Sequence, residues 1–411
     1  KLLSSTFLDQ IFVSAGNFFT TFLLIRFLGL KDFGLFSAIW IIIISANLIQ
    51  QAFIINPFLS ISSKLEGHLK KRYIIDMKFQ QIVFSLIISI LFFFIVITNK
   101  NIFGVSVYGN EEILFMFLSM SIIQFYEFCR RTLYVSSELK NLLKMDSLKY
   151  FIQLSFLLIF LSIGLKSSNI ILLIFDFSCI LSISLFNKDF HKLKFDINSF
   201  IGSYKRNWNI SKWLIFTSIF QWLQSSYLLF LTNFILGPTA LGVLRASQSI
   251  LGISNILLHS IDSWVPVKTS KELINQTPQI FTKNIMDLSR KMTLLFFIIF
   301  LLLVFSSKFI LKLYNPEIIE YLLIFRLYCL TYLIMSINYP IKNILLGLEK
   351  TFSSLISYLL SIILIFIFGK PLITYYGLTG TIITFLISNI SILSINLYYL
   401  KRKINHLNNA Y

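Results

Sequence analysis

The 411-residue sequence has few charged residues and few cysteines, and both scarcities exclude whole classes of protein. Charged residues make up 13 % of the chain, whereas apolar residues make up 56 % and phenylalanine alone occupies 44 positions. A soluble domain of this length cannot bury so much apolar surface, so most of the chain must face lipid. The three cysteines, Cys129, Cys179 and Cys329, stand singly within apolar runs. This excludes a disulfide framework and a cysteine-rich metal site.

Basic residues outnumber acidic residues by 36 to 18, which gives a formal net charge of +18. The excess does not indicate nucleic-acid binding, because Lys and Arg concentrate between apolar runs, as in the cytoplasmic loops of membrane proteins. The four histidines are scattered, and no outer loop is long enough for a catalytic domain. This argues against an enzyme such as a membrane polysaccharide polymerase or ligase. We expect neither a metal nor a cofactor.

Twelve apolar runs are long enough to span a bilayer as helices. We place six in the first half, at 7–28, 36–58, 79–98, 113–134, 148–165 and 169–186. The six in the second half are 213–236, 241–266, 292–313, 318–341, 352–369 and 378–400. Five or six Lys and Arg lie in, or within five residues of, each of the segments after the second, fourth, sixth and eighth runs, whereas the alternate segments have at most two. The positive-inside rule therefore predicts that both termini are cytoplasmic.

One short motif occurs twice, 208 residues apart. A Leu-Gly pair ends one run, at Gly29 and again at Gly237, and a second glycine follows five residues later. A proline then follows near the end of the next run, at Pro57 and at Pro266. Six helices per half make the two repeats parallel. We predict an all-α polytopic membrane protein with an N-terminal lobe (1–186), a cytoplasmic amphipathic connector (187–212) and a C-terminal lobe (213–411).

Three arginines lie deep in predicted spans or in their outer halves: Arg26, Arg245 and Arg326. A charged side chain is costly in hydrocarbon and tends to face a cavity. Arg326 lies eight residues into the tenth run, about 12 Å below the outer boundary. We predict that all three bind an anionic substrate. The alternatives are snorkelling to the outer headgroups for Arg26 and Arg245 and a buried ion pair for Arg326.

Other polar residues complete the candidate site. Amides at depth are candidates for substrate contacts: Asn17, Gln50 and Gln224. Deep carboxylates are candidates for ion coupling: Glu127 and Asp176. Basic residues at the cytoplasmic ends of the fourth and tenth runs are candidates for a phosphate-binding entrance: Arg130, Arg131 and Lys342. The respective alternatives are hydrogen bonds between helices, ion pairs, and ordinary positive-inside anchoring.

The chain begins with Leu8-Asp9-Gln10, Ser14-Ala-Gly-Asn17-Phe18, Arg26-Phe-Leu-Gly29 and Phe33-Gly34, and the second run ends at Pro57. This segment resembles the start of bacterial Wzx-type oligosaccharide flippases. These belong to the MOP superfamily, which also contains MATE exporters and the lipid II flippase MurJ. The motif is confined to this first segment, and the rest of the chain agrees in helix number, basic loops and duplication.

The resemblance implies two lobes that form a V around a central cavity and open alternately to either side. It also implies a cargo of undecaprenyl-diphosphate-linked oligosaccharide, carried across the bacterial inner membrane for O-antigen (lipopolysaccharide), capsule or exopolysaccharide assembly. The partners would be membrane lipids and other polysaccharide-assembly proteins, and the three arginines would engage the diphosphate or acidic sugars. The alternative is a MATE-like cation-coupled exporter of small organic molecules, with Asp9, Glu127 or Asp176 as exchange sites.

Overall fold

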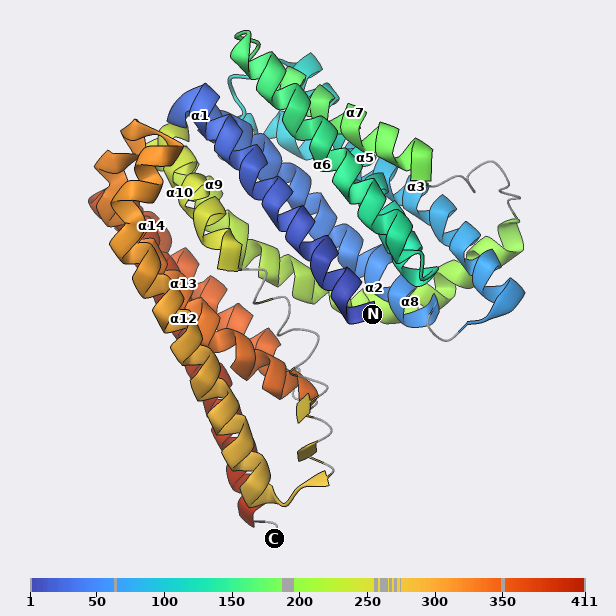
Figure 1. Ribbon diagram of the computed structural model, residues 1–411, viewed down its shortest axis with the longest axis vertical. Helices are drawn as coiled ribbons and strands as arrows, with labels where there is room; N and C mark the ends of the chain where they lie inside the picture. The colour runs from blue at the N-terminus through green and yellow to red at the C-terminus, as the bar shows by residue number, and fades with distance from the viewer. Residues whose placement is uncertain are drawn as a thin grey trace. The chain divides into compact units, whose positions relative to one another are not determined.

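The computed structural model describes residues 2–62, 65–186, 196–254, 275–348 and 352–409, together with residues 258, 265, 268, 269, 272 and 273. Every regular element among these residues is a helix (Figure 1). Nine described segments are long and apolar enough to cross a membrane. Two of them, Ile11–Ser62 and Phe352–Asn405, are 52 and 54 residues long and are kinked at Gly29 and Gly377, so each holds two predicted spans. Contacts divide the chain into two compact units, Lys1–Trp222 and Leu223–Tyr411.

The first unit contains the six predicted spans of the first half. Its helices are α1 (Leu2–Gln50), η1 (Gln51–Ile55), α2 (Asn56–Ser62), α3 (Gly67–Thr98), α4 (Lys100–Phe103), α5 (Asn110–Val135), α6 (Leu139–Ser162), α7 (Ser168–Phe186) and α8 (Ile197–Trp222). Helix α1 lies beside α6, α3 beside α5, and α6 beside α7 (Figure 1). Two buried apolar clusters hold these helices together. One is centred on Phe58, Met77 and Phe128, and the other on Leu142, Met145 and Cys179.

The outward faces of the helices are apolar too, as expected for surfaces that contact lipid. On α3, Leu86, Ile90 and Phe94 recur every four residues and are each more than half exposed. Since lipid is as apolar as the interior, helix association depends on close packing and on polar contacts between helices rather than on hydrophobicity. The interhelical polar contacts therefore contribute directly to the specificity of the fold.

One such contact follows from a proline in the second predicted span. A π-helical turn, η1, directly precedes Asn56 and Pro57. Pro57 has no N–H, so the carbonyl of Phe53, four residues earlier, lacks its usual helical donor. The hydroxyl of Ser211 on α8 donates to that carbonyl at 2.9 Å. The carbonyl freed by the proline thus ties α8 to the second span.

The second unit holds the eighth to twelfth predicted spans and the second part of the seventh. Its helices are η3 (Leu223–Tyr227), α9 (Leu228–Leu236), α10 (Pro238–Leu251), η4 (Gly252–Ser254), α12 (Pro278–Tyr314), η5 (Pro316–Tyr321), α13 (Leu322–Gly347) and α14 (Phe352–Asn409). Helices α12, α13 and α14 lie side by side, and α9 packs on α14 (Figure 1). The predicted eighth span begins in α10, and most of its second half, with Pro266, lies outside the described residues. The all-helical prediction with six spans in each half is confirmed.

The duplicated glycines adopt the same backbone conformation. Gly29 has φ 76° and ψ 175°, and Gly237 has φ 84° and ψ 177°. These angles suit glycine and strain any residue with a Cβ. Pro238 then occupies the first turn of α10, where its missing N–H costs nothing. The repeated sequence motif therefore encodes the same sharp turn between consecutive spans in both units.

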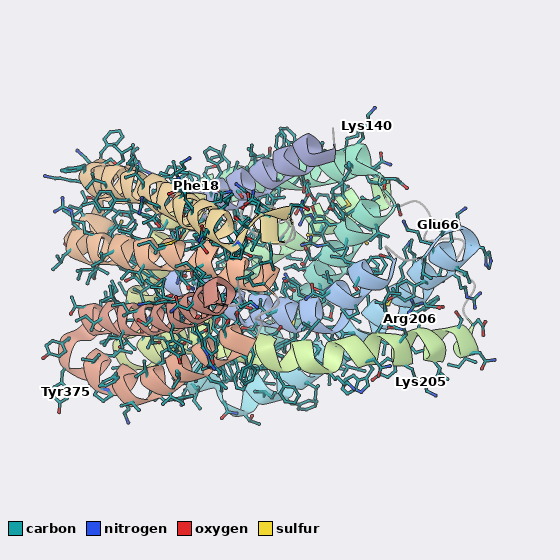
Figure 2. All side chains as sticks on the ribbon, turned by 90° about the horizontal axis from the view of Figure 1, so that it is seen from below. Phe18, Glu66, Lys140, Lys205, Arg206 and Tyr375 are labelled. Atoms are coloured by element: carbon teal, nitrogen blue, oxygen red, sulfur yellow. The ribbon has the colours of Figure 1, made fainter. Side chains whose placement is uncertain are left out.

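The predicted connector is described only in its second part, because residues 187–195 lie outside the described residues. Its remainder belongs to α8, which continues without a break into the predicted seventh span. Helix α8 packs along α3, where the buried carboxylate of Asp76 accepts a hydrogen bond from Ser203 at 2.8 Å. Figure 2 places Lys205 and Arg206 of α8 at the same end of the first unit as Glu66. The predicted lobe boundaries and the placement on the headgroups stay predictions.

Candidate functional site

A charged network in the first unit is centred on Arg130 of α5. The guanidinium of Arg130 donates to Asp146 Oδ2 at 2.8 Å, to Glu127 Oε2 at 3.0 Å and to Asp9 Oδ2 at 3.1 Å. These carboxylates come from α6, α5 and α1, so one side chain connects three helices. Only 13 % of the Arg130 side chain is exposed and Asp146 is fully buried, so water screens these charges weakly.

This Arg130 network, made of Asp9, Glu127, Arg130, Arg131 and Asp146, contains one more carboxylate than guanidinium groups. Arg131 completes it by pairing with Glu127 at 2.7 Å, and 36 % of the Arg131 side chain is exposed. Its formal charge is −1 when every member is ionised, which one proton or one monovalent cation would balance. The structure therefore joins the predicted entrance residues Arg130 and Arg131 to the predicted coupling residue Glu127 through ion pairs.

Polar side chains connect α1 to α6 at two further levels. The hydroxyl of Tyr150 donates to Asn17 Oδ1 at 3.1 Å, and the amide of Gln153 donates to Thr20 Oγ1 at 2.7 Å. Gly16 lies directly against the Tyr150 ring, where an added Cβ would fall 2.2 Å from a ring carbon. The close approach of the two helices thus requires glycine at this position. Asn17, a predicted substrate ligand, makes an interhelical hydrogen bond and is also exposed.

Asp176, the second predicted coupling residue, is buried on α7. Ser119 of α5 donates to its Oδ2 at 2.6 Å. The other carboxylate oxygen has no hydrogen-bond partner, and no cation pairs with Asp176 among the described residues. An unpaired buried charge is costly, so this carboxyl group can be stabilised by taking up a proton or a cation.

Gln50, predicted to contact the substrate, is fully buried within the first unit. Its amide nitrogen donates to Gln81 Oε1 on α3 at 2.9 Å and to the carbonyl of Gln124 on α5 at 2.7 Å. Gln50 therefore links three helices, which is the alternative role for an amide at this depth. Gln224 lies half-buried in the π-helical turn η3 at the start of the second unit.

The second unit contains an arginine that has no counter-charge among the described residues. Arg245 is half-buried on α10, and its guanidinium donates to Gln248 Oε1 at 2.9 Å. The Gln248 amide in turn donates to the hydroxyl of Tyr328 on α13 at 2.5 Å. The Tyr328 ring packs against the rings of Tyr332 and Phe385, with distances between ring centroids of 5.5 Å and 5.9 Å respectively. No carboxylate of the described residues pairs with Arg245, so its charge is available to an anion.

The other two predicted arginines are exposed. Arg326 shares its face of α13 with the exposed residues Leu323 and Leu330, and its Nε donates to Ser307 on α12 at 3.2 Å. An arginine among exposed leucines has the setting of a side chain that snorkels from a lipid-facing surface. Arg26 lies one turn before the kink at Gly29 and makes no ion pair among the described residues.

The remaining predicted entrance residue is Lys342. It lies at the end of the tenth predicted span, which corresponds in the second half to the fourth span that carries Arg130. Lys342 donates to the hydroxyl of Tyr358 at 3.2 Å, sixteen residues further along the chain. Arg130 reaches Asp146 across the same separation of sixteen residues. The two units therefore place a cation at the end of the fourth helix of each repeat against the fifth helix, with a carboxylate partner in one unit and a phenol in the other.

No protein-family model matches the chain, and no curated protein sequence matches it. Solved structures do. A MATE-family multidrug resistance transporter of the MOP superfamily, in an inward-facing conformation, gives a TM-score of 0.79 at 13 % identity over 96 % of each chain. The fold is that of the MOP superfamily. Lipid II flippase MurJ in an inward closed conformation gives a TM-score of 0.74 at 17 % identity, and the match covers 97 % of this chain and 87 % of MurJ.

A third similar structure is a MOP transporter from Pyrococcus furiosus, with a TM-score of 0.64 at 11 % identity over 97 % of this chain and 96 % of that one. Its binding pocket is described as having reversed polarity, with a different function suggested for it. The present chain is a multi-pass membrane protein with this fold, and the structures it resembles are transporters and flippases.

Five residues in or beside the Arg130 network or close to Arg245 are not among the predicted site residues: Asp146, Tyr150, Gln248, Tyr328 and Tyr332. The sequence does contain a pattern that points to the first two. Tyr150 and Gln153 follow Asp146 by four and seven residues, so all three share one face of α6. Gln248 likewise lies three residues after Arg245. Tyr328 is 80 residues away from Gln248, and no local pattern connects them.

Proposed function

We propose that this MOP-fold protein translocates an undecaprenyl-diphosphate-linked oligosaccharide across the bacterial inner membrane by alternating access, for O-antigen, capsule or exopolysaccharide assembly. The observation that carries the proposal is Arg245, a half-buried guanidinium with one amide partner and no carboxylate partner among the described residues. A partly buried charge of this kind is stabilised by an anionic ligand, and a diphosphate suits guanidinium geometry. The adjacent Gln248 and Tyr328 offer further polar groups to a phosphate or sugar oxygen.

The physical task also fits this arrangement. Moving a diphosphate and several sugars through hydrocarbon is prohibitive unless protein groups replace the lost water. The polyprenyl chain can remain in lipid throughout, so the protein needs a polar path only for the headgroup. No bond is made or broken, and no catalytic residue is required. The structural similarity to MurJ, a lipid II flippase, supports this class of cargo.

In this proposal the deep cationic contact is Arg245. Arg131 in the first unit, whose side chain is 36 % exposed, and Lys342 in the second unit are candidates for phosphate contacts near the cytoplasmic end of their own units, whereas Arg130 is held by its three carboxylates. Arg26 and Asn17 are exposed and remain candidates for cargo contacts, as does Gln224. Coupling to an ion gradient would use the first unit, where Asp176 has a carboxylate oxygen without a partner and the Arg130 network carries one excess negative charge.

Asp176 also favours a second candidate function. A MATE-like exporter of small organic molecules would exchange its substrate for a cation at a buried carboxylate such as this one. The two functions differ in the sign of the charge that the substrate carries. Removal of the Arg245 charge should therefore slow flipping of an anionic lipid strongly, whereas it should leave export of an organic cation intact.

The experiment compares two arginine variants in a strain that lacks the chromosomal gene. Deletion should accumulate lipid-linked repeat units, which lipid extraction and mass analysis would identify. Arg245→Gln keeps the length and hydrogen-bonding capacity but removes the charge. Loss of one charge-assisted contact, about 1.5–3 kcal/mol, should weaken headgroup binding about ten- to hundred-fold and leave the accumulation in place.

Arg326→Gln is the matched control, because it removes one arginine charge from the same unit at an exposed position. It should restore surface polysaccharide as wild type does. Normal surface polysaccharide in the deletion strain would defeat the proposed function outright. Full rescue by Arg245→Gln would show that the anionic cargo does not depend on Arg245.

A further inference from the structure

A pocket in the C-terminal unit is lined by α12, α13 and α14, and Arg245 on α10 is not among its lining residues. It has a volume of about 690 Å³, which is within the range of small-molecule sites. Two helices each contribute a continuous face, and α13 contributes Ile341. The lining residues recur at helical spacing and include Ser289, Arg290 and Thr293 on α12 and Leu397 and Lys401 on α14.

The pocket combines an apolar wall with two cations at one level. Arg290 lies two residues before the predicted ninth span, 292–313, and Lys401 lies one residue after the predicted twelfth span, 378–400. Both side chains are therefore at the predicted cytoplasmic boundary of the hydrocarbon, where lipid phosphates lie. Leu397 and Ile341 lie on the membrane side of this level and face the same pocket.

Neither cation is committed to a strong ion pair in the described residues. Arg290 is 3.9 Å from Asp287, and 80 % of the Arg290 side chain is exposed. An exposed pair at that distance contributes little and can rearrange to admit a phosphate. Lys401 is exposed and has no carboxylate partner among the described residues. The hydroxyls of Ser289 and Thr293 supply neutral donors on the same wall of the pocket.

We propose that this α12–α14 pocket binds an anionic phospholipid of the cytoplasmic leaflet. Its phosphate would lie between Arg290 and Lys401, and one acyl chain would lie along Leu397 and Ile341. A free phosphate would leave the apolar wall exposed to water, and a zwitterionic lipid would present its own cation to two others. Basic pockets between membrane helices on the cytoplasmic side suit anionic headgroups for this reason. None of the residues that line the pocket is itself a proposed cargo contact, so the proposal does not depend on the proposed function.

The test measures lipid binding to the purified full-length protein by native mass spectrometry. The probes are phosphatidylglycerol and phosphatidylcholine with identical acyl chains, titrated separately. Wild type should bind phosphatidylglycerol more tightly than phosphatidylcholine. The double variant Arg290→Gln/Lys401→Gln should weaken phosphatidylglycerol binding about thirty-fold, from about 1 kcal/mol for each basic residue. Binding of phosphatidylcholine should be unchanged.

A matched control removes the same number of charges from the opposite end of α12. Lys308 and Lys312 are exposed, and Lys308→Gln/Lys312→Gln should keep the preference for phosphatidylglycerol. A bulky variant, Leu397→Trp, keeps both cations. Its larger side chain should occupy the space of the acyl chain and so weaken phosphatidylglycerol binding. Retained thermal stability of each variant would show that it is folded.

Three results would overturn the proposal. The first is equal binding of the two lipids to wild type. The second is an equal loss of phosphatidylglycerol binding in the two double variants, which would indicate a nonspecific charge effect. The third is displacement of the lipid by inorganic phosphate together with normal binding to Leu397→Trp, since the site would then recognise phosphate alone.

Discussion

Arg130→Gln should destabilise the first unit strongly, because it leaves three carboxylates without their shared cation. In the native protein Arg130 reaches Asp9, Glu127 and Asp146 within 3.1 Å, and Asp146 is fully buried. Removing one partner of a buried ion pair typically costs about 3–5 kcal/mol. For a unit of this size, about 2–4 °C per kcal/mol gives a fall in apparent Tm of about 6–20 °C.

The cysteines supply the assay, because all three are buried in the native protein. A thiol-reactive fluorescent dye labels them only as the protein unfolds in detergent. Cys329→Ser removes the reporter of the second unit and leaves Cys129 and Cys179 to report on the first. Cys179 packs in the same apolar cluster as Tyr126 and Met145, directly beside the Arg130 network. Membrane proteins often unfold irreversibly, so all variants must be heated at one scan rate.

The neighbouring arginine is the control. Among the described residues Arg131 pairs only with Glu127, and its side chain is 36 % exposed, so Arg131→Gln should cost less than about 1 kcal/mol. Its apparent Tm should therefore fall by no more than about 4 °C. An equal shift for the two variants, or no shift for Arg130→Gln, would refute the reasoning that burial of the network determines its contribution.

Two further substitutions test other contacts of the first unit. Gly16→Leu should separate α1 from α6, because even a Cβ at this position would lie 2.2 Å from the Tyr150 ring. Its apparent Tm should therefore fall. Gly202→Ala is the control, because the added Cβ would meet open space and should leave the apparent Tm unchanged. A stable Gly16→Leu variant would contradict this packing. Asp176→Asn can keep the Ser119 hydrogen bond while removing the ionisable group. If Asp176 couples transport, this variant should lose its response to a proton or sodium gradient in proteoliposomes, and an unchanged response would exclude Asp176 as the coupling site.

The fold could be predicted from the sequence because lipid imposes a simple rule. Each span needs about twenty apolar residues with its backbone hydrogen bonds satisfied internally, so apolar runs identify helices directly. The turns at Gly29 and Gly237 were readable for a related reason, since few residues other than glycine tolerate their backbone angles. Local constraints of this kind leave a local signature.

The partners of the polar residues left no such signature. Glu127 and Arg131 are four residues apart on one helix, and their pairing follows from helical spacing. Arg130 and Asp146 meet only because the turn between α5 and α6 brings their faces together, and Gln248 meets Tyr328 across 80 residues. The exposure of Arg326 depends on how α13 packs against α12 and α14. Depth along a helix could be read from the sequence, whereas direction around it could not.

The central claim is that a charged sugar headgroup crosses the membrane with the help of Arg245. The most direct measurement uses proteoliposomes that contain purified protein and undecaprenyl-diphosphate-linked oligosaccharide, with an impermeant glycosidase added outside. With wild-type protein, digestion should have two phases: fast loss of the lipid already in the outer leaflet, then slower loss of the lipid that the protein flips from the inner leaflet. Arg245→Gln should slow this second phase about ten- to hundred-fold. Digestion that stops at the outer-leaflet pool with wild-type protein would contradict the account.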